Sequence, residues 1–96
     1  MELEWKLFAD LKERAGDGRV TVEVGEGATV RDALDALVEA RSGLDGRVLN
    51  DDGALYDHVN VLKNGSSVTA SGEGLDTPVE PRDELALFPP VSGGWR

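Results

Sequence analysis

The carboxyl end of the chain carries residue types that suit chemistry at a chain terminus. A short apolar run there ends in two prolines, which fix φ and remove two backbone donors, so strand pairing must stop. The narrow segment Ser92-Gly93-Gly94 follows. Because glycine has no side chain, such a segment can thread a tight tunnel and bring a carboxylate against a nucleotide phosphate. We therefore expect a body over residues 1–88 and a flexible tail over 89–96, which holds the diglycine and two further residues, Trp95 and Arg96.

The rest of the chain offers little else that could do chemistry. It has no cysteine, which excludes disulfides, thiolate metal sites, iron–sulfur clusters and cysteine nucleophiles. His58 is the only histidine, and the acids Asp51, Asp52 and Asp57 lack the ligand order of an EF-hand. The Gly-acid-Gly triplets at 16–18, 25–27 and 72–74 lack the spacing of phosphate-binding loops and predict turns. We expect a protein that is not an enzyme and that itself binds no cofactor or metal.

The charge balance limits the kinds of partner. Nineteen acidic residues stand against ten basic ones, for a formal net charge of −9. Such a surface repels nucleic acid and anionic lipid, so we expect neither as a partner. The amino terminus has no signal peptide and no membrane span, which predicts a cytoplasmic protein. The acidic excess has two interpretations: docking to a basic partner, or adaptation of the whole surface to high salt, which the even spread of acids and the scarcity of lysine favour.

Strands are predicted from alternating and short apolar runs. The clearest alternation is at 19–24, where Val20, Val22 and Val24 share one face. Further strands are expected at 5–9, 59–63, 67–70 and 85–88, with a helical turn over 10–15. Asn64-Gly65 is a strong hairpin signal between the third and fourth strands. The segments 45–57 and 72–81 are expected to be loops, with Val48, Leu49, Leu55 and Tyr56 as apolar anchors of the first.

A helix is predicted over 29–41. Thr29 can cap it, Asp32 completes a partial capping box, and Gly43 is a plausible stop. An apolar stripe recurs at helical spacing at Val30, Ala33, Leu34, Leu37 and Val38. A helix laid across one face of a sheet is the economical way to bury that stripe. The order of elements predicts an α+β fold of the β-grasp (ubiquitin-like) type, a mixed sheet of four to five strands with one main helix across it.

The chain resembles a known family. Its terminal string, from Asp83 through Leu85-Ala86-Leu87-Phe88-Pro89-Pro90 to Gly94, is similar to the carboxyl end of the small subunit of molybdopterin synthase and of the small archaeal ubiquitin-like modifier proteins. The likeness continues upstream in Trp5-Lys6-Leu7-Phe8-Ala9, in Ala28-Thr29-Val30-Arg31-Asp32-Ala33-Leu34, and in His58-Val59-Asn60-Val61-Leu62-Lys63-Asn64-Gly65. These segments lie in family order and span nearly the whole chain.

The resemblance implies that the chain is activated at its end. In this family a ubiquitin-activating-type enzyme uses ATP to adenylate the terminal glycine carboxylate. A sulfur nucleophile then gives a thiocarboxylate, which serves molybdopterin synthesis or tRNA thiolation, and a lysine amine gives an isopeptide bond. Carried over, Gly94 is the reacting residue, Ser92 and Gly93 thread the partner, and Lys63 is a candidate acceptor lysine. The arm that contacts the partner consists of Phe88, Pro89, Pro90 and Val91.

The partners implied are the adenylating enzyme, target proteins joined through lysine, and a trimming protease. The large subunit of molybdopterin synthase is a further partner if the chain is that enzyme's small, non-catalytic subunit. Sulfur transfer and protein tagging are both left open by the residues. The alternative from a different class is a β-grasp interaction module with no terminal chemistry.

Two features depart from the family pattern. Pro81-Arg82-Asp83 stands where many relatives have Gly-Asp, which implies a changed turn before the last strand. Trp95 and Arg96 extend beyond the diglycine; Trp95 cannot pass a tunnel sized for glycine, and the extension displaces the carboxylate by two residues. Either a protease removes this dipeptide or the dipeptide is not native.

Overall fold

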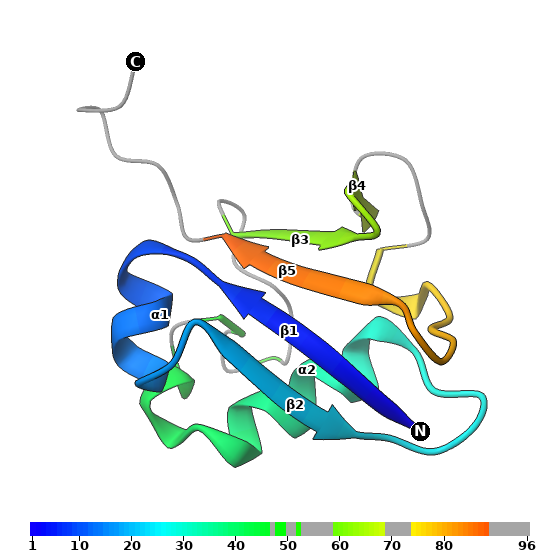
Figure 1. The fold of residues 1–96 in the computed structure, drawn as a ribbon, viewed down its shortest axis with the longest axis horizontal. Coiled ribbons are helices and arrows are strands. Elements are labelled where there is room, and N and C mark those ends of the chain that lie inside the picture. The colour runs from blue at the N-terminus through cyan, green and yellow to red at the C-terminus, as the bar shows by residue number, and fades with distance from the viewer. Residues whose placement is uncertain (47, 50–51, 53–58, 69–73, 89–96) are drawn as a thin grey trace.

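A computed structural model describes residues 1–46, 48–49, 52, 59–68 and 74–88. Strands, helices and two 3₁₀ turns follow one another along these ranges (Figure 1): β1 (Glu2–Leu7), α1 (Ala9–Ala15), β2 (Arg19–Glu23), α2 (Val30–Ala40), η1 (Ser42–Leu44), β3 (Asn60–Lys63), β4 (Ser66–Ser67), η2 (Gly74–Asp76) and β5 (Glu84–Phe88).

The strands of the described residues form one mixed sheet in the order β2-β1-β5-β3-β4. β1 and β5 are parallel neighbours, while the pairs β1–β2, β3–β5 and β3–β4 are antiparallel. Helix α2 lies across one face of this sheet (Figure 1). The predicted β-grasp architecture, with a mixed sheet and one main helix, is confirmed.

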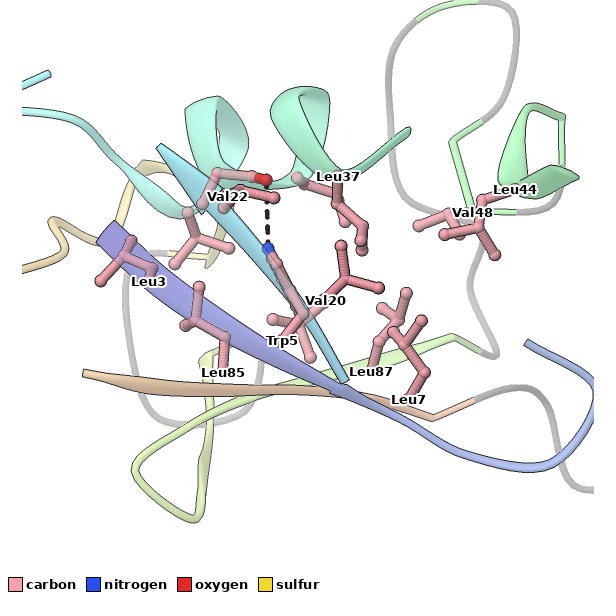
Figure 2. Packing of buried hydrophobic residues seen from close by; sticks show 14 of the residues in the cluster. Leu3, Trp5, Leu7, Val20, Val22, Leu37, Leu44, Val48, Leu85 and Leu87 are labelled. Atoms are coloured by element: carbon pink, nitrogen blue, oxygen red, sulfur yellow. Dashed lines mark hydrogen bonds between the residues drawn. The ribbon is translucent and has the colours of Figure 1, made fainter. Parts of the chain in front are cut away.

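The sheet buries one face because its strand residues alternate between apolar and polar. In β1, Leu3, Trp5 and Leu7 are buried, whereas the residues between them are at least partly exposed. The Trp5 side chain has no exposed surface, and its indole Nε1–H donates to the carbonyl oxygen of Ala33 at 3.1 Å (Figure 2). Because a buried indole needs an acceptor, this bond ties the middle of β1 to α2.

Helix α2 forms as its sequence predicts. The backbone N–H of Thr29 donates to Oδ2 of Asp32 at 3.0 Å, as in a capping box. The predicted stripe faces the sheet: Val30, Ala33, Leu34 and Leu37 expose no surface, and Val38 is partly buried against the core. The packing of this stripe on the apolar face of the sheet is the main core of the molecule.

The predicted role of Gly43 as a helix stop is wrong. Helix α2 ends at Ala40, and the N–H of Arg41 donates to the carbonyl oxygen of Leu37 at 2.9 Å. Gly43 lies in η1, where a Cβ atom would collide with the backbone carbonyl of Arg14. The glycine therefore allows η1 to approach α1 closely, a tertiary requirement that local sequence does not reveal.

Several strand limits differ from the predicted ones. β1 begins at Glu2 and ends at Leu7, because its pairing with β2 starts at Glu2 opposite Glu23. β4 contains only Ser66–Ser67, so the predicted strand over 67–70 starts one residue late and is wrong at Val68; residues 69–70 lie outside the described residues. The expected turn over 10–15 is the helix α1.

The 45–57 segment is described in part. Val48 exposes no surface and Leu49 packs against the core, so both predicted anchors are confirmed. Of the other residues singled out there, Asp52 is described and exposed, and the rest lie outside the described ranges: Asp51, Leu55, Tyr56, Asp57 and, next to them, His58. The parts of the chain that the structure describes contain no cluster of three or more His, Asp or Glu side chains suited to a metal ion. They also contain no helix that is long and apolar enough to span a membrane.

Candidate functional site

Strand β5 fixes the point at which the chain enters its terminal segment. It lies between β1 and β3, and its side chains Leu85 and Leu87 expose no surface. Its last residue, Phe88, stands opposite Asn60 of β3. A strand that is paired on both edges and buried on one face holds its end firmly, because opening it would break both ladders. The predicted site residues that follow Phe88 lie outside the described residues: Pro89, Pro90, Val91, Ser92, Gly93, Gly94, Trp95 and Arg96.

Phe88 is stacked on Phe8. The two rings are 4.3 Å apart between centroids and lie within 4° of parallel. Their contact follows from the parallel register, since Leu7 of β1 stands beside Leu87 of β5 and each phenylalanine is the next residue along the chain. Phe8 keeps 39% of its surface exposed, so an aromatic face is open beside the root of the tail.

Sequence reasoning missed Phe8 as part of this site. A signal was present, because each phenylalanine directly follows the last leucine of an apolar run, Leu7 or Leu87. Recognising it requires the knowledge that β1 and β5 are parallel neighbours, which places both strand ends at the same edge of the sheet. That neighbour relation is set by the whole fold, so no local pattern gives it.

The start of β5 is held by a polar network. Asn64 donates from Nδ2 to Oδ1 of Asp83 at 3.0 Å, and its own Oδ1 accepts the backbone N–H of Glu84 at 2.9 Å. Asp83 also accepts the backbone N–H of Glu80 at 2.7 Å. The predicted hairpin is confirmed, with φ of +52° at Asn64 and +88° at Gly65. Both ends of β5 are therefore fixed, one by this network and the other by the aromatic stack.

Lys63, the candidate acceptor lysine, lies at the other end of β5 from Phe88. In the β3–β5 register it stands opposite Leu85. Its ammonium group donates to the carbonyl oxygen of Pro78 at 3.0 Å and lies 3.9 Å from Oδ2 of Asp83. Its side chain is 28% exposed. The structure thus engages the Lys63 amine in local contacts and does not bring it near the root of the tail.

The described part of this site is a contact surface. It offers exposed aromatic carbon at a fixed position, next to the segment whose sequence suits terminal chemistry. Neither ring is a nucleophile, an acid or a base. The reacting atoms implied by the resemblance belong to Gly94, which lies outside the described residues.

A β-grasp body whose central strand ends at the root of a diglycine segment defines the class of ubiquitin-like proteins. Within that class, the model of the ThiS family matches residues 5–94, and the chain therefore belongs to the ThiS family. The match runs through both glycines and ends at residue 94, with Trp95 and Arg96 beyond it.

Similar proteins are small modifier proteins of Haloferax volcanii. Small archaeal modifier protein 1 is 60% identical over 92 residues, which cover 96% of this chain and 100% of the relative. Small archaeal modifier protein 3 is 42% identical over 94 residues, 98% of this chain and 100% of the relative. The crystal structure of the first protein has a TM-score of 0.88 and 56% identity, and covers 98% of this chain and 100% of that one. The resemblance to small archaeal modifier proteins inferred from the sequence is confirmed.

A more distant likeness concerns a protein complex. In the crystal structure of the Amycolatopsis orientalis BexX/CysO complex, the matching chain is 27% identical, with a TM-score of 0.80. The match covers 96% of this chain and 99% of that one.

Proposed function

We propose that the chain is a ubiquitin-like carrier that reacts through the carboxylate of Gly94 once Trp95 and Arg96 have been removed. The observation that carries this proposal is the extent of the family match, which includes the diglycine and stops at residue 94. While Trp95 is attached, Gly94 ends in an amide bond and has no carboxylate. Removal of the dipeptide is therefore a chemical requirement of the mechanism.

Activation turns the Gly94 carboxylate into a mixed anhydride. A carboxylate oxygen attacks the α-phosphorus of ATP, the bond to the β-phosphate oxygen breaks, and pyrophosphate leaves. A nucleophile then attacks the acyl carbon, and AMP leaves as the acyl–oxygen bond breaks. Attack by sulfide (HS⁻) yields a thiocarboxylate with loss of a proton, and attack by a lysine amine yields an isopeptide bond, also with loss of a proton. ATP binds to the activating enzyme, and the chain is the substrate of the reaction.

The body holds Phe88, the residue from which the tail starts, in a fixed position. Phe88 is held by the β1–β5–β3 pairing and by its stack on Phe8. From Phe88 to Gly94 the chain advances by six residues, which reach about 20 Å when fully extended. An enzyme that accepts the Gly94 carboxylate must therefore come close to the surface around Phe88. The BexX/CysO complex supports a protein partner for a chain of this fold.

In this proposal a protease first removes Trp95 and Arg96 from the chain. The activating enzyme then acts on the trimmed chain in the cytoplasm. Target lysines would accept the acyl group in isopeptide formation, and the large subunit of molybdopterin synthase would be the protein partner of the thiocarboxylate form. Thiocarboxylate formation and isopeptide formation both pass through the same acyl-adenylate, so one experiment tests the step that they share.

The test compares the full chain with a chain that ends at Gly94, each mixed with the adenylating enzyme of the source cells and ATP. The trimmed chain retains the described core, whose residues lie between Leu3 and Leu87. It should release pyrophosphate and form an acyl-adenylate, and the full chain should do neither. A trimmed chain with Gly94→Val should be inactive while keeping the same thermal midpoint, because the buried core lies between Leu3 and Leu87 and a substitution near a chain end costs little stability. Equal reaction of the full and trimmed chains would refute the proposal, and a lack of reaction by both would favour the interaction module.

A further inference from the structure

The face of the sheet that α2 leaves uncovered is divided by charge. In the β1–β2 register, the two acids Glu2 and Glu23 stand opposite each other at one end. At the other end Lys6 stands opposite Arg19. Like charges directly opposite on neighbouring strands destabilise a sheet, so neither pairing is explained by stability of the fold.

The cationic end contains a groove. The groove has a volume of about 590 Å³, and its charged lining residues are Lys6, Lys12 and Arg19, with no carboxylate among the residues that line it. The stem of Lys12 lies over Gly18, where a Cβ atom would be 3.2 Å from its Cε. By contrast, the groove between β2 and α2 is lined by five acids and by no basic residue. In a chain of net charge −9, three of the ten basic residues line this one groove.

Two of these cations have no anionic partner within the described part of the molecule. Lys6 forms an ion pair with Glu84 at 3.3 Å. Neither Lys12 nor Arg19 forms an ion pair or a side-chain hydrogen bond with a residue that the structure describes. Their positive charge is available to an external group.

The groove adjoins the root of the tail. Phe8 lines it, and Phe8 is the residue stacked on Phe88. A protein that takes up the Gly94 carboxylate approaches Phe88 within the reach of about 20 Å set by the tail. The surface of that protein therefore faces the cations of this groove.

We infer that this groove, which we call the Lys12–Arg19 groove, docks an acidic segment of the adenylating enzyme. The inference rests on the proposed function and names the chemistry of the partner: carboxylates that pair with Lys12 and Arg19 while the tail enters the active site. Charge complementarity favours an acidic segment at this groove, because the groove is cationic and the net negative charge of the chain repels acidic segments elsewhere. Docking at the groove raises affinity and leaves the chemistry at Gly94 unchanged.

The test uses charge reversal in the chain that ends at Gly94. Lys12→Glu with Arg19→Glu should raise the Kd for the adenylating enzyme, measured by calorimetry without ATP, at least tenfold. With ATP it should raise KM for the carrier by a similar factor and change kcat by less than twofold. The charge-conserving pair Lys12→Arg with Arg19→Lys should stay within threefold of the parent in both measurements.

A matched control separates the groove from net charge. Arg31→Glu with Arg82→Glu makes the same change in total charge at sites outside the groove, and should alter Kd by less than threefold. A Kd for the groove variant within twofold of the parent would overturn the inference, as would an equal loss of affinity in the control. Binding by the parent without pyrophosphate release would instead count against the proposed function. Thermal midpoints of all variants confirm that each is folded.

Discussion

Arg82 has a backbone conformation that its side chain disfavours. Its φ is +77°, and it follows Pro81 in a turn closed by the N–H of Asp83, which donates to the carbonyl oxygen of Glu80 at 3.1 Å. Proline at the second position and positive φ at the third define a type II turn, which favours glycine at the third position. This is the place where many relatives have Gly-Asp, so the sequence departure keeps the turn and adds strain.

Arg82→Gly should therefore stabilise the protein. Removing the Cβ relieves about 1–2 kcal/mol of left-handed strain, and the greater freedom of glycine in the unfolded chain offsets about 0.4–1 kcal/mol. We expect the free energy of unfolding, measured in denaturant, to rise by about 0.5–1 kcal/mol. Glu80→Gly, at a residue of the same turn without positive φ, should lower it. A loss of stability in Arg82→Gly would show that the arginine side chain is needed there.

At the scale of elements, α2 carries the central packing of the fold. Leu37 exposes no surface, and its side chain extends from α2 toward the sheet (Figure 2). Leu37→Ala should lower the free energy of unfolding by about 2–5 kcal/mol, since it removes buried contacts and leaves a cavity. Asp35→Ala, on the exposed side of the same helix, should cost far less. A near-zero effect of Leu37→Ala in denaturant unfolding would contradict the packing of α2 on the sheet.

The elements differ in how well the sequence predicts them. The stripe of α2, the alternation in β2 and the Asn64-Gly65 turn are local patterns, and all three form as predicted. The start of β1, the short β4 and the role of Gly43 depend on contacts with distant residues. Local periodicity does not contain those contacts, so the predictions failed there.

The candidate site divides in the same way. The tail and its diglycine are a contiguous motif that can be recognised directly in the sequence. The Phe8–Phe88 stack and the Lys12–Arg19 groove combine residues from separate segments. The parallel pairing of β1 with β5 creates the first, and the β1–α1–β2 connection creates the second.

At the scale of the whole molecule, net charge governs the response to salt. The −9 charge leaves uncompensated repulsion in the folded state, and molar salt shortens the Debye length to about 3 Å. We expect the thermal midpoint at neutral pH to rise by at least about 4 °C between dilute and molar potassium chloride, a shift that corresponds to roughly 1 kcal/mol for a domain of this size.

A variant with fewer acids provides the control for this prediction. Asp35→Asn with Glu39→Gln removes two exposed charges from α2 and should reduce the dependence of the midpoint on salt. Equal midpoints of the parent in dilute and molar salt would remove salt adaptation as the explanation of the acidic surface. Docking of that surface to a basic partner would then be the better explanation.

The central claim is that the working chain ends at Gly94, and the intact mass of the protein from its native cells tests it most directly. Recombinant chains ending at Gly94 and at Arg96 serve as mass standards. The account predicts the mass of residues 1–94, with a fraction in which sulfur replaces one carboxylate oxygen. The account would be contradicted if all of the protein recovered from its native cells had the mass of the chain ending at Arg96.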